Sequence, residues 1–97
     1  LLEEERRFLR ALRSGVSLLR DGSVSTARDA LAELLVAAEL RDERADVHLY
    51  LAVALERVGS SAAGAALRTA LDLCPNLART APGRRAVELG LDLGVHP

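Results

Sequence analysis

Apolar residues recur every three or four positions in five segments of the chain. In the first segment, for example, Phe8, Leu12 and Leu19 share one helical face while charged residues hold the opposite one. Such spacing is typical of amphipathic α-helices. The pattern predicts five helices, over residues 3–21, 26–40, 47–58, 61–74 and 83–93. Since no stretch alternates with period two, we expect an all-α fold of antiparallel helix hairpins.

Glycine and proline mark the expected ends of these helices. Gly22, Gly59 and Gly94 each follow an apolar periodic segment and suit the residue after a helix. Pro75 ends the fourth segment because proline cannot donate the next backbone hydrogen bond. The polar segment 41–46 separates the second and third helices although it contains neither glycine nor proline, and its last residue is a candidate N-cap.

Serine and proline mark the expected starts of three helices. Ser23 or Ser25 can cap the second helix, and Ser60 or Ser61 the fourth, because a serine oxygen accepts from the first free backbone N–H groups. Pro82 suits the first turn of the fifth helix, where no backbone donor is needed.

Two stretches of the chain are similar to each other. "SLLRDGSVSTARDALAELL" and "VALERVGSSAAGAALRTAL" each contain a helix, a glycine, a serine-rich turn and then small and apolar residues at matched spacing. A repeat of about this length with two helices per unit predicts a solenoid. We therefore expect one domain over residues 1–97, with repeat one at about 8–41, repeat two at about 45–76 and a terminal capping helix at about 83–93.

The second unit carries small and apolar residues at positions that characterise a known repeat family. These residues are Leu51, Ala52, Leu55, Gly59, Ala63, Ala70, Pro75 and Asn76. With them the unit resembles a tetratricopeptide repeat (TPR), whereas the first unit matches at fewer positions: Gly15, Leu18, Gly22, Ala27 and Leu31. The resemblance implies a short TPR-like α-solenoid that serves as an adaptor or scaffold in protein–protein interaction.

The resemblance also implies a binding surface. In this family the first helix of each repeat lines a concave face that receives an extended peptide or a partner helix. By position, the implied partner-binding residues are Leu9, Leu12, Arg13, Val16, Arg20, Leu49, Tyr50, Val53 and Arg57. Family members that clamp an acidic chaperone tail have polar residues where this chain has Leu12, Val16, Leu49 and Val53, which argues against that ligand.

Three occupants of this apolar strip remain open at the level of sequence. The fifth helix can fold over it, since apolar stripes are usually core. A second copy of the chain can cover it as a homodimer. Alternatively, an amphipathic peptide or protein segment of a partner can lie in it, with acidic flanks meeting the arginines.

Composition and charge argue against several other partners and locations. The net charge is −1 and the aromatic residues are Phe8 and Tyr50, so neither a basic surface nor a stacking platform favours nucleic acid. No apolar run approaches the roughly 20 residues of a membrane span. Cys74 is the single cysteine, which predicts a cytoplasmic protein. The chain starts at Leu1 without a methionine, which suggests a fragment of a longer protein.

No catalytic or metal-binding set can be assembled from the sequence. His48, His96 and Cys74 lack the spacing of metal ligands, so neither a metal nor a cofactor is expected. Carboxylates such as Glu3 lie at i+3 and i+4 spacing from arginines, as on a solvated helix face. We therefore expect no enzyme. The alternative to an adaptor is a self-associating regulatory or dimerisation domain whose catalytic or DNA-binding part lies outside this chain.

Gly64 interrupts the interior of the fourth predicted helix. Glycine there costs about 1 kcal/mol relative to alanine. Close approach of another helix would offset that cost, and simple tolerance in an alanine-rich helix is the alternative.

Overall fold

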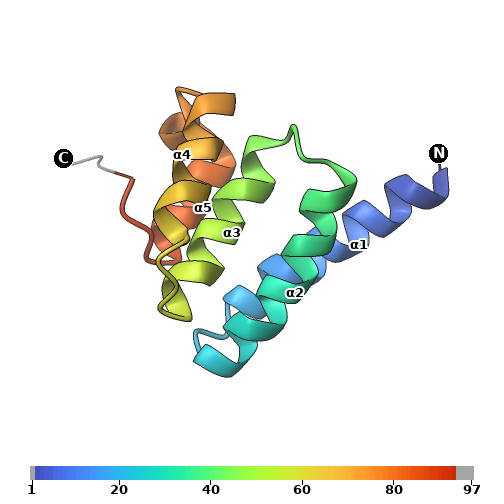
Figure 1. Cartoon of the computed structure of the whole chain (residues 1–97), viewed down its shortest axis with the longest axis horizontal. Helices are drawn as coiled ribbons and strands as arrows, with labels where there is room; N and C mark the ends of the chain where they lie inside the picture. The colour runs from blue at the N-terminus through green and yellow to red at the C-terminus, as the bar shows by residue number, and fades with distance from the viewer. Residues whose placement is uncertain (1, 94–97) are drawn as a thin grey trace.

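Five α-helices and one short 3₁₀ helix follow one another along residues 2–93, which are the residues that the computed structural model describes (Figure 1). The helices are α1 (Leu2–Leu19), α2 (Val24–Leu40), α3 (Ala45–Arg57), α4 (Ala63–Leu73) and α5 (Ala81–Glu88), with the 3₁₀ helix η1 (Leu77–Arg79) between α4 and α5. No strand occurs within these residues. The prediction of an all-α fold is confirmed.

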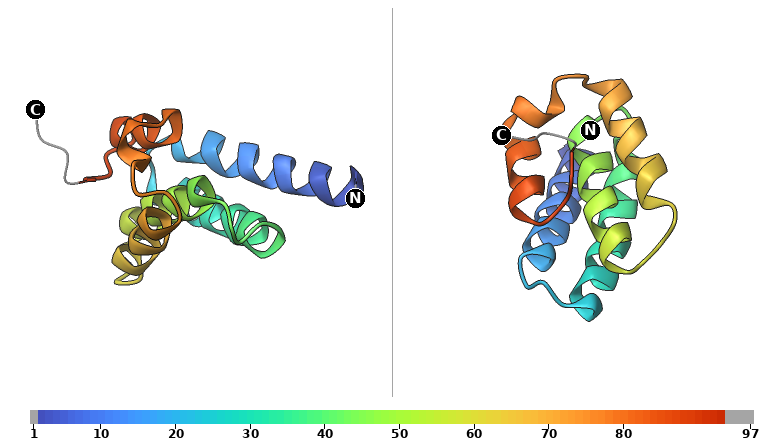
Figure 2. Two further views of the ribbon diagram at one scale, coloured as in Figure 1. Left: turned by 90° about the horizontal axis from the view of Figure 1, so that it is seen from above. Right: turned by 90° about the vertical axis from the view of Figure 1, so that its left-hand side faces the viewer.

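Adjacent helices pack in pairs, with α3 at the centre of the stack. α1 packs on α2 and α3 packs on α4, while α2 and α5 also contact α3. Figure 2 shows α1 and α5 on one side of α3, and α2 and α4 on the other. Because α3 has neighbours on several sides, seven of its 13 residues are buried, whereas α4 buries Ala70 alone.

Local signals set most of the helix ends as expected. Gly22 and Gly59 have φ angles of +81° and +76°, a left-handed conformation that glycine adopts without the steric cost of a side chain. The N-cap of α2 is Ser23, whose Oγ accepts a hydrogen bond of 3.1 Å from the backbone N–H of Thr26. Pro82 lies in the first turn of α5, as predicted.

The predicted cap of the fourth helix is wrong. α4 begins at Ala63, and neither Ser60 nor Ser61 caps it, because its N-cap residue is Ala62. The Oγ of Ser60 accepts instead from the backbone N–H of Ala62 at 3.1 Å. The serine therefore orders the turn that precedes the helix.

The predicted end of the fifth helix is also wrong. α5 ends at Glu88, five residues before the expected boundary at 93, because Gly90 adopts a φ angle of +102°. The backbone N–H of Leu91 then bonds back to the carbonyl of Ala86 at 3.0 Å. This is the hydrogen-bond pattern of a glycine-terminated helix. The expected terminator, Gly94, lies outside the described residues.

Two glycines allow elements to approach closely. A Cβ atom on Gly15 of α1 would lie 2.6 Å from Cγ of Leu34 in α2, and one on Gly83 of α5 would lie 1.9 Å from the carbonyl oxygen of Leu77 in η1. Gly64 differs, since a Cβ there would meet nothing within 4 Å. No helix of the described residues therefore makes the close approach to Gly64 that was one explanation for it.

The loop between α2 and α3 is attached to the N-terminal part of α1. Arg41 donates hydrogen bonds to the carboxylates of Glu4 and Glu5, the second at 3.1 Å. The guanidinium carbons of Arg41 and Arg44 lie 5.8 and 4.9 Å from the ring centroid of Phe8, which is fully buried. The two arginines thus cover the apolar end of the α1–α2 hairpin.

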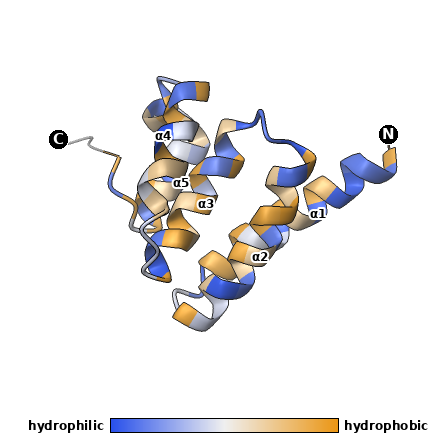
Figure 3. Cartoon of the chain, in the orientation of Figure 1, coloured by the Kyte–Doolittle hydropathy of each residue, from blue (hydrophilic) through white to orange (hydrophobic). Residues whose placement is uncertain are grey.

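α2 carries apolar residues on its outer side as well as its inner side. Val24 and Leu35 are about half exposed, while Ala30 and Leu34 are buried against the rest of the stack. The visible side of α2 is accordingly largely orange in Figure 3. α2 is therefore less amphipathic than α1, although Arg28, Asp29, Glu33 and Glu39 also lie on it.

Candidate partner-binding pocket

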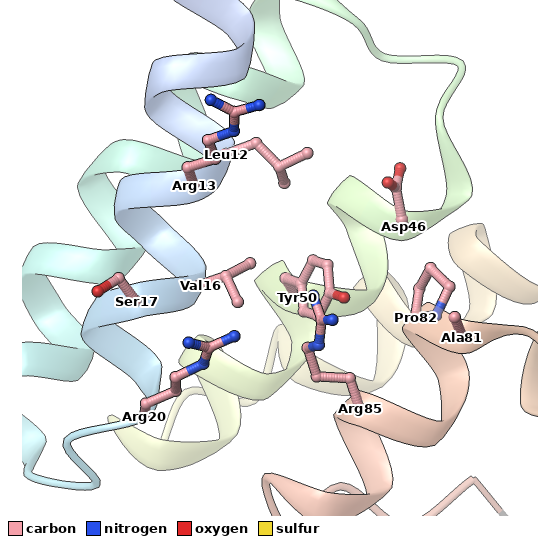
Figure 4. Close-up of a pocket in the computed structure, with 10 residues that line it drawn as sticks. All are labelled: Leu12, Arg13, Val16, Ser17, Arg20, Asp46, Tyr50, Ala81, Pro82 and Arg85. Carbon is pink, nitrogen blue, oxygen red and sulfur yellow. The ribbon is translucent and has the colours of Figure 1, made fainter.

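A pocket of about 370 Å³ opens between α1, α3 and α5. Its lining residues are Leu12, Arg13, Val16, Ser17 and Arg20 of α1, Asp46 and Tyr50 of α3, and Ala81, Pro82 and Arg85 of α5 (Figure 4). The pocket lies on the face that the first helices of the two hairpins share with α5. It is therefore on the side of the molecule where the sequence placed the binding strip.

The inner wall of the pocket is apolar. Leu12 and Val16 lie one helical turn apart and so project from the same side of α1. In Figure 4 both point toward Tyr50 of α3, with Pro82 of α5 beyond it. Val16 and Tyr50 are buried and Leu12 is half-buried. An apolar side chain of a ligand can therefore pack against this wall, and no polar atom of the protein core becomes exposed when it does.

The rim of the pocket is positively charged. Arg13, Arg20 and Arg85 are exposed, and none of them forms an ion pair within residues 2–93. Arg20 from α1 and Arg85 from α5 extend toward Tyr50 from opposite sides in Figure 4. Asp46 is the carboxylate of the lining, and its Oδ2 lies 2.8 Å from Nη2 of Arg44. The rim therefore presents three arginines and one already neutralised carboxylate.

Tyr50 places a hydroxyl beside these arginines. Burial raises the pKa of the Tyr50 hydroxyl, and the neighbouring guanidinium of Arg85 acts in the opposite direction. Because the resulting pKa lies above the ordinary value of 10.0, the hydroxyl is protonated at neutral pH. The pocket can thus offer an O–H donor together with guanidinium groups to an anionic group of a ligand.

Five of the nine predicted binding residues line the pocket, but two others belong to the core. The five are Leu12, Arg13, Val16, Arg20 and Tyr50. Leu49 and Val53 are 0% and 2% exposed and lie in the main hydrophobic cluster. The expectation that these two form part of an exposed strip is wrong, because α3 is enclosed by its neighbours. Leu9 is half-buried on α1 and lies outside the pocket lining.

Arg57, the remaining predicted residue, has partners within the chain. Its guanidinium donates to the carbonyl of Leu19 at the end of α1 and to the carbonyl of Leu89 after α5, the latter at 2.9 Å. A cation is favourable at both places because carbonyl groups at helix C-termini carry partial negative charge. Arg57 therefore connects the two helices that flank the pocket, instead of standing free beside a groove.

The segment after α5 covers the other half of the predicted strip. Leu89, Gly90 and Leu91 lie next to Val53 and Arg57 around a small cavity of about 50 Å³. The terminal part of the described chain thus covers the strip at the C-terminal end of α3. The strip stays open at the N-terminal end of α3, where the larger pocket is found.

Sequence reasoning missed the pocket residues that α5 contributes. Arg85 falls in the capping helix predicted over residues 83–93, and Ala81 and Pro82 lie just before it, so none of the three was predicted as a binding residue. One feature of the sequence points to them. Pro82 marks the start of the helix that follows the second hairpin, where a third repeat would place its first helix. Ser17 was also missed, and in Figure 4 its side chain points away from the centre of the pocket.

Side chains of the types that bind metals or act as nucleophiles contact neighbouring residues of the chain and form no site together. No group of three or more His, Cys, Asp or Glu side chains within residues 2–93 is arranged to hold a metal ion. The Sγ of Cys74 lies 3.2 Å from Oδ1 of Asn76, and Nε2 of His48 lies 2.7 Å from the carbonyl oxygen of Asp42. His96 lies outside the described residues.

Fold and pocket define a small all-α stack of helical hairpins with an apolar, arginine-rimmed pocket between α1, α3 and α5. No protein-family model, curated protein or solved structure matches the chain. Within the described part of the chain, none of the helices combines the length and the apolar character needed to cross a membrane.

Proposed function

We propose that this chain is a TPR-like protein–protein interaction module, an adaptor or scaffold, that binds a segment of another protein in the pocket between α1, α3 and α5. The observation that carries the proposal is the pocket itself. Its wall is apolar at Leu12 and Val16, and its rim holds three arginines that form no ion pair within the described residues. A peptide or amphipathic helix with an apolar side chain and nearby carboxylates complements both features.

The arrangement of the helices supports the TPR-like part of the proposal. Both hairpins turn at a glycine with positive φ, Gly22 in the first and Gly59 in the second. α1 and α3, the first helices of the two hairpins, and α5, which follows them, line one common pocket. A repeat protein that binds along its first helices needs this placement.

The pocket indicates a binding reaction of moderate strength. Burial of one large apolar side chain contributes about 1.5–3 kcal/mol. Charge-assisted hydrogen bonds to arginine add to this, while ordering of the bound segment opposes it. A cytoplasmic location belongs to the same proposal and is supported by Cys74, which has no second cysteine in the chain to pair with.

Selection from a random peptide display library tests this function. We expect the purified chain to enrich peptides whose affinity falls at least about tenfold with Leu12→Glu or with Arg85→Glu. Leu35→Glu is the matched control, because Leu35 is exposed on α2, on the other side of α3 from the pocket. Circular dichroism must show that all three variants remain helical.

Two results would contradict the proposal. Enrichment of no peptide above background is one. The other is a set of peptides that bind the Leu12→Glu and Arg85→Glu variants as tightly as the unchanged chain. Since Arg85 is exposed, its substitution removes charge from the rim without opening the core.

A further inference from the structure

The open face of α1 continues from the pocket toward the N-terminus. Leu2, Leu9 and Val16 are spaced seven residues apart, as are Arg6, Arg13 and Arg20. We refer to these six residues as the α1 stripe. On an α-helix, residues seven apart lie two turns apart on nearly the same face. Since Arg13, Val16 and Arg20 line the pocket, Leu2, Arg6 and Leu9 extend the same face beyond it.

The α1 stripe is accessible over most of its length. Leu2 is 74% exposed, the three arginines are exposed, and Leu9 is half-buried. The N-terminal part of α1 extends beyond the other helices in the left view of Figure 2. α1 has 18 residues, which corresponds to a length of about 27 Å. A long, narrow surface with a deeper pocket near one end is therefore available.

The seven-residue spacing distinguishes a helical occupant from an extended one. Apolar side chains at the first and fourth positions of a seven-residue repeat, with charged residues beside them, form the contact surface of coiled coils. On α1, Leu12 lies at the fourth position of the repeat that begins with Leu9, and Arg13 lies beside it. An extended peptide places alternate side chains about 6.6 Å apart and has no matching repeat. The α1 stripe therefore fits a second helix that packs along α1 at a small crossing angle.

The charges on the α1 stripe determine the kind of partner. Arg6, Arg13 and Arg20 lie on it without an ion pair in the described residues. Of the three carboxylates on α1, Glu4 and Glu5 pair with Arg41 at the loop after α2, and Glu3 forms no ion pair within the described residues. In helix pairs, charged residues that flank the apolar seam select partners of opposite charge. An acidic helix is complementary to this surface, and a basic helix is repelled by it.

We infer that the occupant of the pocket is an amphipathic α-helix of a partner protein, about 18 residues long, that lies along the α1 stripe with acidic residues beside its apolar seam. This inference rests on the proposed function. One large apolar side chain of the partner helix enters the pocket near Val16, and its carboxylates meet Arg6, Arg13 and Arg20. The interaction is then specific for charge as well as for apolar spacing.

The same charges argue against a second copy as the occupant. Two α1 stripes packed against each other would bring three arginines from each copy into one interface. Glu3, the one carboxylate of each α1 without an ion pair in the described residues, could not neutralise three arginines, and Glu4 and Glu5 are already engaged by Arg41. Like charges in an interface oppose association.

A display library with a fixed helical scaffold tests the inference. The scaffold has leucine at heptad spacing over 18 residues, and Glu, Gln, Lys or Arg at random in the flanking positions. We expect selection on the unchanged chain to enrich Glu at the flanks. On the triple variant Arg6→Glu, Arg13→Glu, Arg20→Glu, we expect Lys and Arg instead, and at least about 100-fold weaker binding of the acidic helices.

A matched control has the same change in net charge. The variant Arg28→Glu, Ala32→Glu, Ala65→Glu, Arg68→Glu changes exposed residues of α2 and α4 and leaves α1 unchanged. We expect it to bind the selected acidic helices within about threefold of the unchanged chain, because charges beyond a Debye length are largely screened. Equal losses in both variants would overturn the inference, since the effect would then be one of net charge.

The remaining outcomes separate this inference from the proposed function. Enrichment of uncharged or basic residues at the flanking positions overturns the inference that the partner helix is acidic. If the random library yields proline-containing peptides and the helical scaffold yields no binder, the occupant of the pocket is not a helix. The proposed function is left intact in that case. No binder from either library contradicts both. A dimer in analytical ultracentrifugation that the Arg6, Arg13, Arg20 variant dissociates makes a second copy the occupant instead.

Discussion

α1 and α3 hold equivalent positions in the two hairpins, yet the same kinds of residue have different surroundings in each. Val16 of α1 and Val53 of α3 lie 37 positions apart, as do Arg20 and Arg57. Val16 lines the pocket and Arg20 stands exposed on its rim. Val53 belongs to the same core cluster as Val16 but is more completely buried and lies outside this pocket, and Arg57 is bonded to the ends of two other helices.

The number of neighbours explains the difference between the two helices. α1 is the first helix of the stack and packs mainly on α2, with a smaller contact on α3. α3 is enclosed by α1, α2, α4 and α5. An apolar face on the outermost helix can stay partly open, whereas the same face on a central helix becomes core. Binding capacity in this molecule therefore lies mainly on α1 and where α5 approaches it.

Among the substitutions that test this comparison of α1 with α3, Val53→Glu should have the largest effect on stability. A carboxylate at a position that is 2% exposed has no partner and costs several kcal/mol, a large part of the roughly 5–15 kcal/mol that stabilises a small domain. We expect loss of the cooperative thermal transition in circular dichroism. Val16→Glu is the matched change and should destabilise the chain less, because Val16 borders the pocket and the new carboxylate can turn toward Arg20. Equal effects of the two substitutions would contradict the difference between α1 and α3.

Gly83→Ala should have the next largest effect, because it displaces α5 from its place beside α3. The new Cβ would lie 1.9 Å from the carbonyl oxygen of Leu77, so the backbone of η1 or α5 must move. We expect a loss of about 2–3 kcal/mol in the free energy of unfolding, measured by urea denaturation. The control is Gly64→Ala, where the Cβ meets nothing and helix propensity predicts a gain of up to about 1 kcal/mol. A stable Gly83→Ala variant would show that α5 does not depend on this close approach.

Arg57→Met should have a smaller effect on stability. Its comparison with Arg20→Met distinguishes the two arginines at equivalent positions of α3 and α1. It removes the hydrogen bonds to the carbonyls of Leu19 and Leu89, while the apolar stem is kept. Loss of hydrogen bonds from a charged group predicts a decrease of about 1.5–3 kcal/mol in the free energy of unfolding. Arg20→Met should change it by less than about 0.5 kcal/mol, as is usual for surface substitutions. Similar values for the two variants would argue against a structural role for Arg57.

Much of the fold could be predicted because its signals are local. Helical periodicity and turn residues such as Gly22 and Gly59 act within a few positions of the ends that they define. The predicted end of the fifth helix is too late because the prediction runs on to Gly94 across Leu89, Leu91 and Leu93, whose spacing of two is not helical. The positive φ of Gly90 ends the helix first.

The site could be predicted less well, because exposure depends on elements distant in sequence. Periodicity assigns Leu12 and Leu49 to the same face of equivalent helices, but it does not say how many neighbours each helix has. Leu49 is buried because α3 is central. Arg85 joins the pocket through the packing of α5 on α3, which no motif in the sequence encodes.

The smallest expected effect concerns the attachment of α1 at Glu4, on the side away from the α1 stripe. The hydrogen bond from Arg41 lowers the pKa of the Glu4 carboxyl below its ordinary value of 4.5. A lowered pKa means that the contribution to stability is present above pH 4.5 and is lost as the pH falls through the folded-state value. Glu4→Gln should therefore lower the Tm slightly at pH 7, and the difference should shrink as the pH falls below 4.5 and vanish below the folded-state pKa. Glu3→Gln is the control, because Glu3 shares the first turn of α1 but forms no ion pair within the described residues.

The difference between the Glu4→Gln variant and the unchanged chain should also shrink in 1 M salt, since the pair of Glu4 and Arg41 is exposed. An identical pH profile for the two variants would assign the effect to the charge of the helix N-terminus, and the pair with Arg41 would then not stabilise the attachment of α1.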